Sequence, residues 1–393
     1  MNIFSDEVRR NPYPLYDHLR AASPVLRVPP PFNGWMLFDY ESVQWALNDH
    51  ETFSSRVPAP RNWFLFFDPP AHTKLRALIS RAFTPRAIAN LEPRIQQLSA
   101  ELLDGAMDRG TIDIAADYAV PLPMKVIAGM IGIPPEEWVT YKRWSDTILR
   151  LSYSRSGAED AERAKRDFTA VTGEMQAYLA ELISTRRRDP QDDLLTRLME
   201  AEVDGERLAA EEILGFFQML VVGGQETTTD LIGNAVLSLL ENPDQLARLR
   251  AEPNLLESAI EEVLRYRSPL QWIMRTPRRH TAVRGQEIPE GALVLPMIGS
   301  ANRDPLQFAE PNRFDIGRQP NPHIAFGHGI HFCIGAALSR LEAKIALADI
   351  LARFRSFELA SAEPWEPRPA LHVHGPASLP IRFQPNTRAA SVS

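Results

Sequence analysis

The spacing of apolar and polar residues predicts a mostly helical chain with short strands near its two ends. Between residues 85 and 199 apolar side chains recur every three or four positions, which is the period of a helix with one buried face. The clearest helices predicted there are 91–108, 135–152 and 164–187, with others at 41–48, from 68 onward, at 255–266 and at 334–354. Strands are predicted at 25–28, 35–38, 281–283 and 292–295, and as a final pair at 371–373 and 379–383. No internal repeat or long linker divides the chain.

One predicted helix differs from the others because its middle is apolar almost all round. Residues 211–240 have the length of a single helix of about 45 Å, and within 213–222 the only polar side chain is Gln218. Such a segment is buried on every side. Gly223 and Gly224 follow, although each glycine inside a helix costs roughly 1 kcal/mol relative to alanine. Either these glycines kink the helix or allow tight helix packing, or they let a ligand approach its backbone.

An aromatic loop is predicted at 54–67, and it contains the run Trp63-Phe64-Leu65-Phe66-Phe67. Aromatic side chains in a loop either cap a core or line an apolar pocket, and the residues alone favour the core. The helix that follows places His72 and Arg76 on one face, four residues apart. Taken alone, these two cations indicate only a solvated face.

Composition and charge narrow the class of protein. The hydrophobic share of 44% and the charged share of 24% are ordinary for a soluble globular protein, and the formal net charge of −7 argues against general affinity for nucleic acid or anionic membranes. No uncharged apolar stretch approaches the ~20 residues that span a bilayer, and the N-terminus lacks the apolar core of a secretory signal. The single cysteine excludes an intrachain disulfide and fits a reducing compartment, so we expect a soluble cytoplasmic protein.

That cysteine lies in the stretch Phe326-Gly327-His328-Gly329-Ile330-His331-Phe332-Cys333-Ile334-Gly335, directly before a predicted helix. A thiolate is a strong soft ligand for iron when it is kept ionised. The backbone N–H groups and positive dipole end of a helix favour an anion there, and glycines allow a tight turn around the sulfur. Phe326 and Phe332 are placed to exclude water. A lone cysteine is more often a buried packing residue, but the surrounding pattern reverses that interpretation.

The pattern F-x-x-G-x-H-x-C-x-G resembles the haem-binding loop of the cytochrome P450 family. Further segments resemble that family in its order and approximate spacing: the glycine–acid–threonine segment 223–227, the pair Glu262 and Arg265, and, as in soluble bacterial members, 68–76 and 301–305. The resemblance extends from Pro12 to about Phe383. It implies one mainly α domain with a smaller β-rich part over 1–393, ending in a frayed tail from about 385. Haem b is expected between the long helix and the cysteine helix.

The resemblance implies a role for each motif. Cys333 is expected to be the thiolate ligand of the iron, and Glu226 with Thr227 the acid–alcohol pair that relays protons during oxygen activation. The other residues expected to hold the cofactor are His72, Arg76, Gly223, Arg275, Phe326, His331 and Gly335, and the four cations among them are expected to pair with the haem propionates. Glu262 and Arg265 are expected to brace the core beneath the cysteine loop. Gly223 stands where the family often has alanine, which changes little.

The resemblance also favours pocket over core for the aromatic loop. The residues expected to line a substrate pocket are Trp63, Phe64, Phe66, Phe67, Phe217, Leu220, Gly224, Leu270, Trp272, Ile273 and Ala377. Arg61 and Asn62 are placed to bind a polar end of a ligand, such as a carboxylate.

The expected function is that of a haem-thiolate monooxygenase, which inserts one oxygen atom from O2 into a hydrophobic small molecule. One cysteine cannot hold an iron–sulfur cluster and no flavin motif is present, so electrons are expected from a separate ferredoxin or flavodoxin. Lys74, Arg81 and Arg340 are expected to contribute positive charge where that partner docks on a monomeric enzyme. A peroxide-driven peroxygenase and a non-catalytic haem sensor are the alternatives, and the acid–alcohol pair disfavours both.

Overall fold

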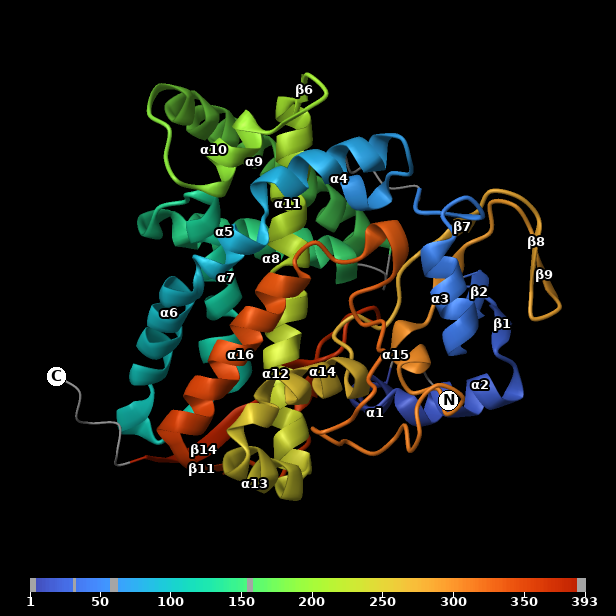
Figure 1. Cartoon of the computed structure of the whole chain (residues 1–393), viewed down its shortest axis with the longest axis vertical. Helices are drawn as coiled ribbons and strands as arrows, with labels where there is room; N and C mark the ends of the chain where they lie inside the picture. Colours follow the sequence, from blue (N-terminus) through green and yellow to red (C-terminus); the bar gives the residue numbers. More distant parts are fainter. Residues whose placement is uncertain (1–4, 31–32, 57–62, 154–157, 387–393) are drawn as a thin grey trace. The chain divides into compact units, whose positions relative to one another are not determined.

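The computed structural model describes residues 5–30, 33–56, 63–153 and 158–386 (Figure 1). By its internal contacts the chain forms two compact units. Unit 1 consists of Met1–Val57, Gln96–Pro121 and Thr227–Ser393, and unit 2 of Pro58–Ile95 and Leu122–Glu226. The chain therefore passes between the units at positions 57/58, 95/96, 121/122 and 226/227.

Unit 1 contains most of the strands. Its helices are α1 (Asp6–Arg10), α2 (Tyr13–Ala22), α3 (Tyr40–Asn48), most of α6 (Glu92–Asp104), the π-helix η3 (Ile114–Ala119), nearly all of α12 (Glu226–Glu241), α13 (Pro243–Ala251), α14 (Leu256–Tyr266), α15 (Ile298–Ala301) and α16 (Ala336–Arg353). One sheet has the order β1 (Val25–Val28), β2 (Gly34–Leu37), β10 (Val294–Pro296), and a second the order β11 (Phe354–Leu359), β14 (Pro380–Pro385), β4 (Thr111–Asp113). Two-stranded sheets are formed by β3 (Phe53–Ser54) with β7 (Thr276–Pro277), β8 (Thr281–Val283) with β9 (Gln286–Ile288), and β12 (Glu366–Pro367) with β13 (Pro376–Ser378).

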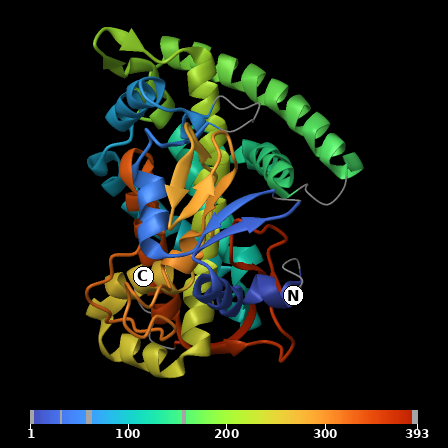
Figure 2. The ribbon, with the colours of Figure 1, turned by 90° about the vertical axis from the view of Figure 1, so that its right-hand side faces the viewer.

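Unit 2 is built almost entirely from helices. They are α4 (Ala71–Ala82), α5 (Pro85–Ala89), nearly all of α7 (Pro121–Ile131), α8 (Trp138–Tyr153), α9 (Ala158–Arg188), α10 (Leu194–Glu200) and α11 (Ala210–Gly223). A short hairpin of β5 (Glu202–Val203) and β6 (Glu206–Arg207) lies between α10 and α11. Figure 2 shows α9 as a long continuous helix, which begins six residues before its predicted start at 164.

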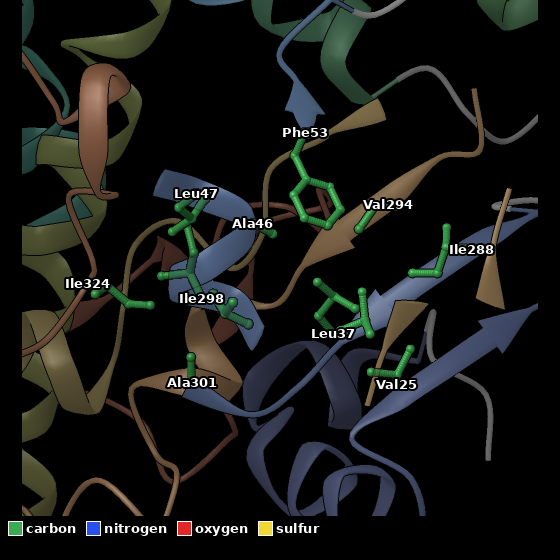
Figure 3. Close-up of a cluster of buried hydrophobic side chains, with 12 residues drawn as sticks. Val25, Leu37, Ala46, Leu47, Phe53, Ile288, Val294, Ile298, Ala301 and Ile324 are labelled. Carbon is green, nitrogen blue, oxygen red and sulfur yellow. The ribbon is translucent and has the colours of Figure 1, made fainter. Parts of the chain in front are cut away.

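Hydrophobic side chains cover both faces of the sheet β1–β2–β10. Leu37 and Val294 belong to one cluster, which helices α3 and α15 complete (Figure 3), whereas Phe38 and Leu295 belong to another, which α2 completes. Neighbouring residues of a strand point to opposite faces, so this division follows from the pleat. The predicted strands 25–28 and 35–38 are thus confirmed to within one residue, and their antiparallel register pairs Val25 with Leu37.

The predicted helix 211–240 is interrupted, which corrects the expectation of one continuous helix. Helix α11 ends at Gly223 and α12 begins at Glu226, with Gly224 and Gln225 in a turn between them. A Cβ atom on Gly224 would lie 2.5 Å from Cδ1 of Ile127 in α7. Gly224 therefore lies in close contact with α7 within unit 2, which supports helix packing as a reason for this glycine.

The prediction of a final hairpin from 371–373 and 379–383 is wrong. Residues 371–373 form no strand apart from an isolated bridge between Val373 and Leu270, and β14 pairs with β11 and β4 instead. Phe354 and Phe383 stack across the β11–β14 pair with ring centroids 3.9 Å apart. Burial of these rings favours the partner that lies distant in sequence over the adjacent segment.

One stretch, Ile114–Ile131, is long and apolar enough to cross a membrane by length and composition alone. It contains Asp117 and Lys125, and 61% of it is buried within the protein, as in the core helix of a soluble protein. It is therefore weak evidence for a membrane span.

The side chains of Glu262 and Arg265 form a fully buried ion pair on α14. Arg265 Nε donates to Glu262 Oε2 and Arg265 Nη2 donates to Oε1, both at 2.8 Å, and neither side chain is exposed. The remaining donors of Arg265 bind the carbonyl oxygens of Asn302, Pro311 and Arg313. The Glu262 carboxylate also accepts from the backbone of Asp315 and from the side chains of Arg318 and Asn321. A buried charge pair stabilises a fold only when its other hydrogen-bonding positions are satisfied in this way.

We expect Glu262→Gln to lower the free energy of unfolding by about 3–5 kcal/mol, because it leaves the buried Arg265 guanidinium uncompensated. Urea unfolding followed by circular dichroism measures this loss. The control is Glu257→Gln, which removes an exposed carboxylate from the same helix, α14. Glu257 pairs with Lys344. That change should cost less than about 1 kcal/mol. Equal losses in the two variants would contradict the prediction.

Candidate active site

Cys333 is exposed and lies just before the first turn of α16, whose N-cap is Gly335. The Cys333 N–H donates to Phe326 O at 2.9 Å, which closes the loop that precedes the helix. The rings of Phe326 and Phe332 flank this closure with centroids 6.3 Å apart. The sulfur therefore lies at the end of a helix where the dipole favours an anion.

Two glycines shape the cysteine loop. Gly327 and Gly329 have φ values of 76° and 68°, in the left-handed region that side chains rarely adopt. A Cβ on Gly329 would also lie 3.0 Å from Cα of Asn48 at the end of α3. The loop thus packs directly on a rigid element of unit 1, which fixes where the sulfur is presented.

A charged cluster lies next to the same loop. Arg340 donates from Nε and Nη2 to Glu261 at 2.7 and 2.8 Å, and its guanidinium lies 4.5 Å from the centre of the Phe326 ring. His323 Nε2 lies 3.0 Å from Glu261 Oε2, the oxygen that also accepts from Arg340 Nη2. Burial raises the pKa of Glu261, but the hydrogen bonds from Arg340 and His323 outweigh burial and lower it to about 2. The hydrogen bond to Glu261 and, less strongly, the nearby Cys333 raise the pKa of Arg340, so that side chain remains charged.

Helix α12 begins with the predicted acid–alcohol pair. Glu226 is buried and opens the first turn, and Thr227 is half-buried. The next two residues of the helix form hydrogen bonds with neighbouring elements. Thr228 Oγ1 donates to Ser339 Oγ of α16 at 3.2 Å, and Thr229 Oγ1 donates to Ala119 O at 2.8 Å. Two of the three consecutive hydroxyl groups therefore have structural partners within unit 1.

In unit 2, the aromatic loop packs beside α4. The ring of Phe64 lies 5.8 Å from that of His72, which is 2% exposed, and 6.2 Å from that of Phe216. Trp63 stacks on Phe66 at 6.0 Å and donates from Nε1 to Gln218 Oε1 at 3.2 Å. Gln218, the one polar side chain of the apolar segment 213–222, thus accepts a hydrogen bond from a buried tryptophan.

Comparisons with known proteins agree across the chain. The sequence profile of the family described as "Cytochrome P450" matches residues 154–378. The chain is 42% identical over 387 residues to "Cytochrome P450 109" of Bacillus spizizenii, covering 97% of this chain and 94% of that protein. The solved structure of cytochrome P450 CYP109Q5 from Chondromyces apiculatus has a TM-score of 0.88 at 41% identity and covers 98% of both chains. That of CYP109E1 from Bacillus megaterium in complex with testosterone has a TM-score of 0.88 at 36% identity, covering 95% of this chain and 99% of that one.

The chain belongs to the cytochrome P450 family. It has the fold of that family, and its relatives identify it as a bacterial-type P450 monooxygenase. These conclusions confirm the fold class and the enzyme class expected from the sequence.

Haem b is the cofactor of the P450 family, and the cysteine loop fits it. Cys333 provides an exposed soft ligand directly before the first turn of α16. In unit 1, Arg275 is buried and His331 half-buried, and in unit 2, His72 is buried and Arg76 half-buried. Cations protected from water suit the binding of carboxylates such as the haem propionates. Gly223 is exposed and has room for a Cβ, so the glycine is not sterically required there.

Several residues that the resemblance predicts in the substrate pocket pack against apolar side chains. Phe217 and Leu220 line, with other apolar residues of unit 2, a cavity of about 10 Å³, which holds at most one water molecule. In unit 1, Leu270 and Ile273 pack against the cluster in Figure 3. Trp272 lies in the second cluster and donates from Nε1 to Leu371 O at 3.0 Å. These placements favour core packing for the five residues.

Gly224, also predicted in the pocket, lies against Ile127, and the other pocket predictions lie in two segments. Trp63 and Phe64 are buried while Phe66 and Phe67 are half-buried beside α4, and Ala377 is half-buried in β13. Arg61 and Asn62 lie outside the described residues. Sequence reasoning also missed the contacts of Glu261 with His323 and Arg340, because these positions are up to 79 residues apart and no local spacing links them.

The segment that leads into β13 contains a buried histidine. His374 Nε2 donates to Arg10 O at 3.0 Å, and burial, together with Arg267 and Arg303, lowers the pKa of His374 to about 3. The folded protein therefore holds this imidazole neutral, whereas the unfolded chain protonates it below its ordinary pKa of 6.5.

We expect a pH dependence of stability from His374. Because its folded pKa is depressed, its contribution is complete above pH 6.5 and is lost as the pH falls from 6.5 towards 3. Between pH 7.5 and 5.5 the wild type should lose about 1.4 kcal/mol of unfolding free energy more than His374→Gln, which cannot titrate but can still donate to Arg10 O. Urea unfolding of both proteins at the two pH values checks this. Parallel losses would show that His374 is not held neutral.

Proposed function

We propose that this P450 inserts one oxygen atom from O2 into a hydrophobic small molecule, with electrons from a separate ferredoxin or flavodoxin. The observation that carries the proposal is the exposed Cys333 thiol at the start of α16, in a chain that also has Glu226 and Thr227 at the start of α12. A haem with a thiolate ligand supplies oxygen activation and insertion when it is bound.

The protein residues take three roles in this proposal. Cys333 donates the thiolate, and the start of α16 stabilises its negative charge. Thr227 Oγ1 holds and passes a proton, and the Glu226 carboxyl group replenishes it from the protein interior. Arg275, His331, His72 and Arg76 orient the cofactor through its carboxylates.

Apolar side chains support a hydrophobic substrate. Phe66 and Phe67 of the aromatic segment and Ala377 of β13 are the half-buried pocket candidates, whereas Trp63 and Phe64 are buried. The relative CYP109E1 holds testosterone in its solved structure, which makes this steroid a suitable first probe. We propose that binding is governed by burial of apolar surface, at roughly 25 cal/mol per Å².

A separate electron donor is proposed because the chain has one cysteine and no flavin motif. Of the three cations expected to help dock it, Lys74 pairs with Glu206 and Arg340 pairs with Glu261, whereas Arg81 is exposed. Arg81 is therefore the cation whose field is least compensated. The relatives match nearly end to end, which supports residues 1–393 acting as one P450 domain, and we propose a cytoplasmic monomer.

A peroxide-driven reaction is the alternative within the same family. It needs no delivery of protons to O2, so the retained Glu226 and Thr227 favour the O2 route.

We expect Thr227→Ala to uncouple electron consumption from product formation, because the proton-relaying hydroxyl is lost. Product per NADPH, measured with a surrogate ferredoxin system and a hydrophobic substrate, should fall at least about 10-fold. The matched control is Thr229→Ala in the same helix, whose hydroxyl bonds to Ala119 O, and it should leave the yield per NADPH unchanged. Undiminished yield in Thr227→Ala would remove the relay role, and equal yield with peroxide alone would favour the peroxygenase.

We expect Arg81→Glu to slow reduction by ferredoxin about 3- to 10-fold at low ionic strength and to weaken its salt dependence, since a docking charge is reversed. Stopped-flow reduction under carbon monoxide measures the rate. Arg188→Glu, at the exposed end of α9, makes the same change in net charge and serves as control. Equal rates for Arg81→Glu and the wild type would contradict docking at this position.

A further inference from the structure

One face of α12 is in close contact with the segment that leads into β13. Asp230, Gly233 and Asn234 lie on this face at helical spacings of three and four. A Cβ on Gly233 would lie 2.9 Å from Cγ of Pro376, and Asn234 Nδ2 donates to His374 O at 2.7 Å. Because these atoms are already in contact, the segment has little room to move along α12.

Asp230 adds a charged contact between this face of α12 and the hairpin β12–β13. Arg368, directly after β12, donates from Nε to Asp230 Oδ1 at 2.6 Å. The Asp230 side chain is fully buried and that of Arg368 is 15% exposed. A Cβ on Gly375 would lie 2.5 Å from the same Asp230 oxygen, so the carboxylate lies directly against the hairpin backbone.

The hairpin is held from other directions as well. The Arg368 N–H donates to Gly375 O at 3.1 Å, which ties the two strands together. Helix α1 contributes Arg9, which donates to Arg368 O at 3.3 Å, and Arg10, which donates to Trp365 O at 2.8 Å. Arg368 thus contacts α1 and the other strand of the hairpin through its backbone and α12 through its side chain.

The same face of α12 begins with Thr227, three residues before Asp230. The helix that contains the proposed proton relay is therefore also the one on which the hairpin with Ala377 is seated. A shift of the hairpin along α12 would change the distance between Ala377 and the reacting end of the helix.

We propose that the buried Asp230–Arg368 ion pair is a positioning device, which seats β13 on α12 and thereby sets the wall of the substrate pocket at Ala377. The inference rests on the proposed function, since it takes Ala377 as a pocket residue. Asp230 and Arg368 do not touch the substrate in this account; they act through the hairpin. Loss of one charge leaves the other uncompensated at the contact, and the hairpin moves.

The test uses ligands that need no turnover. Imidazole binds haem iron and fills little of the pocket, whereas 4-phenylimidazole adds a ring that must fit against the pocket wall. The ratio of their dissociation constants, measured by absorbance titration of the ferric holoenzyme, therefore reports the wall and not the iron. This readout is independent of oxygen activation, so the inference and the monooxygenase proposal can fail separately.

In Asp230→Asn we expect the dissociation constant of 4-phenylimidazole to rise about 10-fold relative to that of imidazole, because the phenyl ring loses apolar contact. The double variant Asp230→Asn with Arg368→Gln replaces the ion pair by a neutral hydrogen-bonded pair, and it should restore the ratio. Glu241→Gln is the matched control. It removes a carboxylate from the other end of α12, where Glu241 pairs with Arg267, and it should leave the ratio unchanged.

Three results would overturn the proposal: an unchanged ratio in Asp230→Asn, an equal change in Glu241→Gln, or a parallel weakening of both ligands. If Asp230→Asn does not retain haem, the proposal is tested with two other proteins. They are the double variant (Asp230→Asn with Arg368→Gln) and Arg368→Lys. A wild-type ratio in the double variant together with an altered ratio in Arg368→Lys supports positioning by the pair. An altered ratio in the double variant, or a wild-type ratio in Arg368→Lys, contradicts it.

Discussion

The position of a single sulfur atom is the constraint on which the rest of unit 1 depends. Cys333 must remain accessible to a ligand and yet be fixed, although it lies in an irregular loop. The protein meets both demands with backbone contacts: Gly329 approaches Asn48 so closely that no side chain fits, and the Cys333 N–H is bonded to Phe326 O. Helix α16 then supplies a dipole that stabilises a thiolate.

Buried charges, more than apolar contacts alone, define how the segments of unit 1 are seated. Helix α14 contributes Glu261 towards the cysteine loop and Glu262 with Arg265 towards the segment 302–321. On α12, Asp230 and Arg368 connect the reacting helix to a hairpin. A charge pair of this kind has a narrow range of acceptable geometries, since a small displacement leaves a buried charge poorly compensated. Apolar clusters such as the one in Figure 3 tolerate more adjustment.

Local patterns in the sequence predicted most helices and the first strand pair, because apolar periodicity and turn residues act over a few positions. The cysteine motif also predicted the helix that follows it, and α16 begins at Ala336, two residues after the predicted start. Shielding of the sulfur by Phe326 and Phe332 was expected, whereas Cys333 and Phe332 are exposed. Two of the failures have a common physical cause. The interruption at Gly224 depends on Ile127, and the partner of β14 depends on Phe354. Each of these features depends on a contact between residues that are distant in sequence, as does the ion pair of Asp230 with Arg368. The local spacing of residues does not predict such contacts.

The central claim is that Cys333 provides a thiolate to haem iron, and one spectrum tests it directly. The purified protein is reduced, exposed to carbon monoxide, and its visible absorption is compared with that of the reduced protein alone. A strongly red-shifted Soret band, absent in Cys333→Ser, is the predicted result. A band at the shorter wavelength typical of a neutral axial ligand, or no haem at all in a folded protein, would contradict the account.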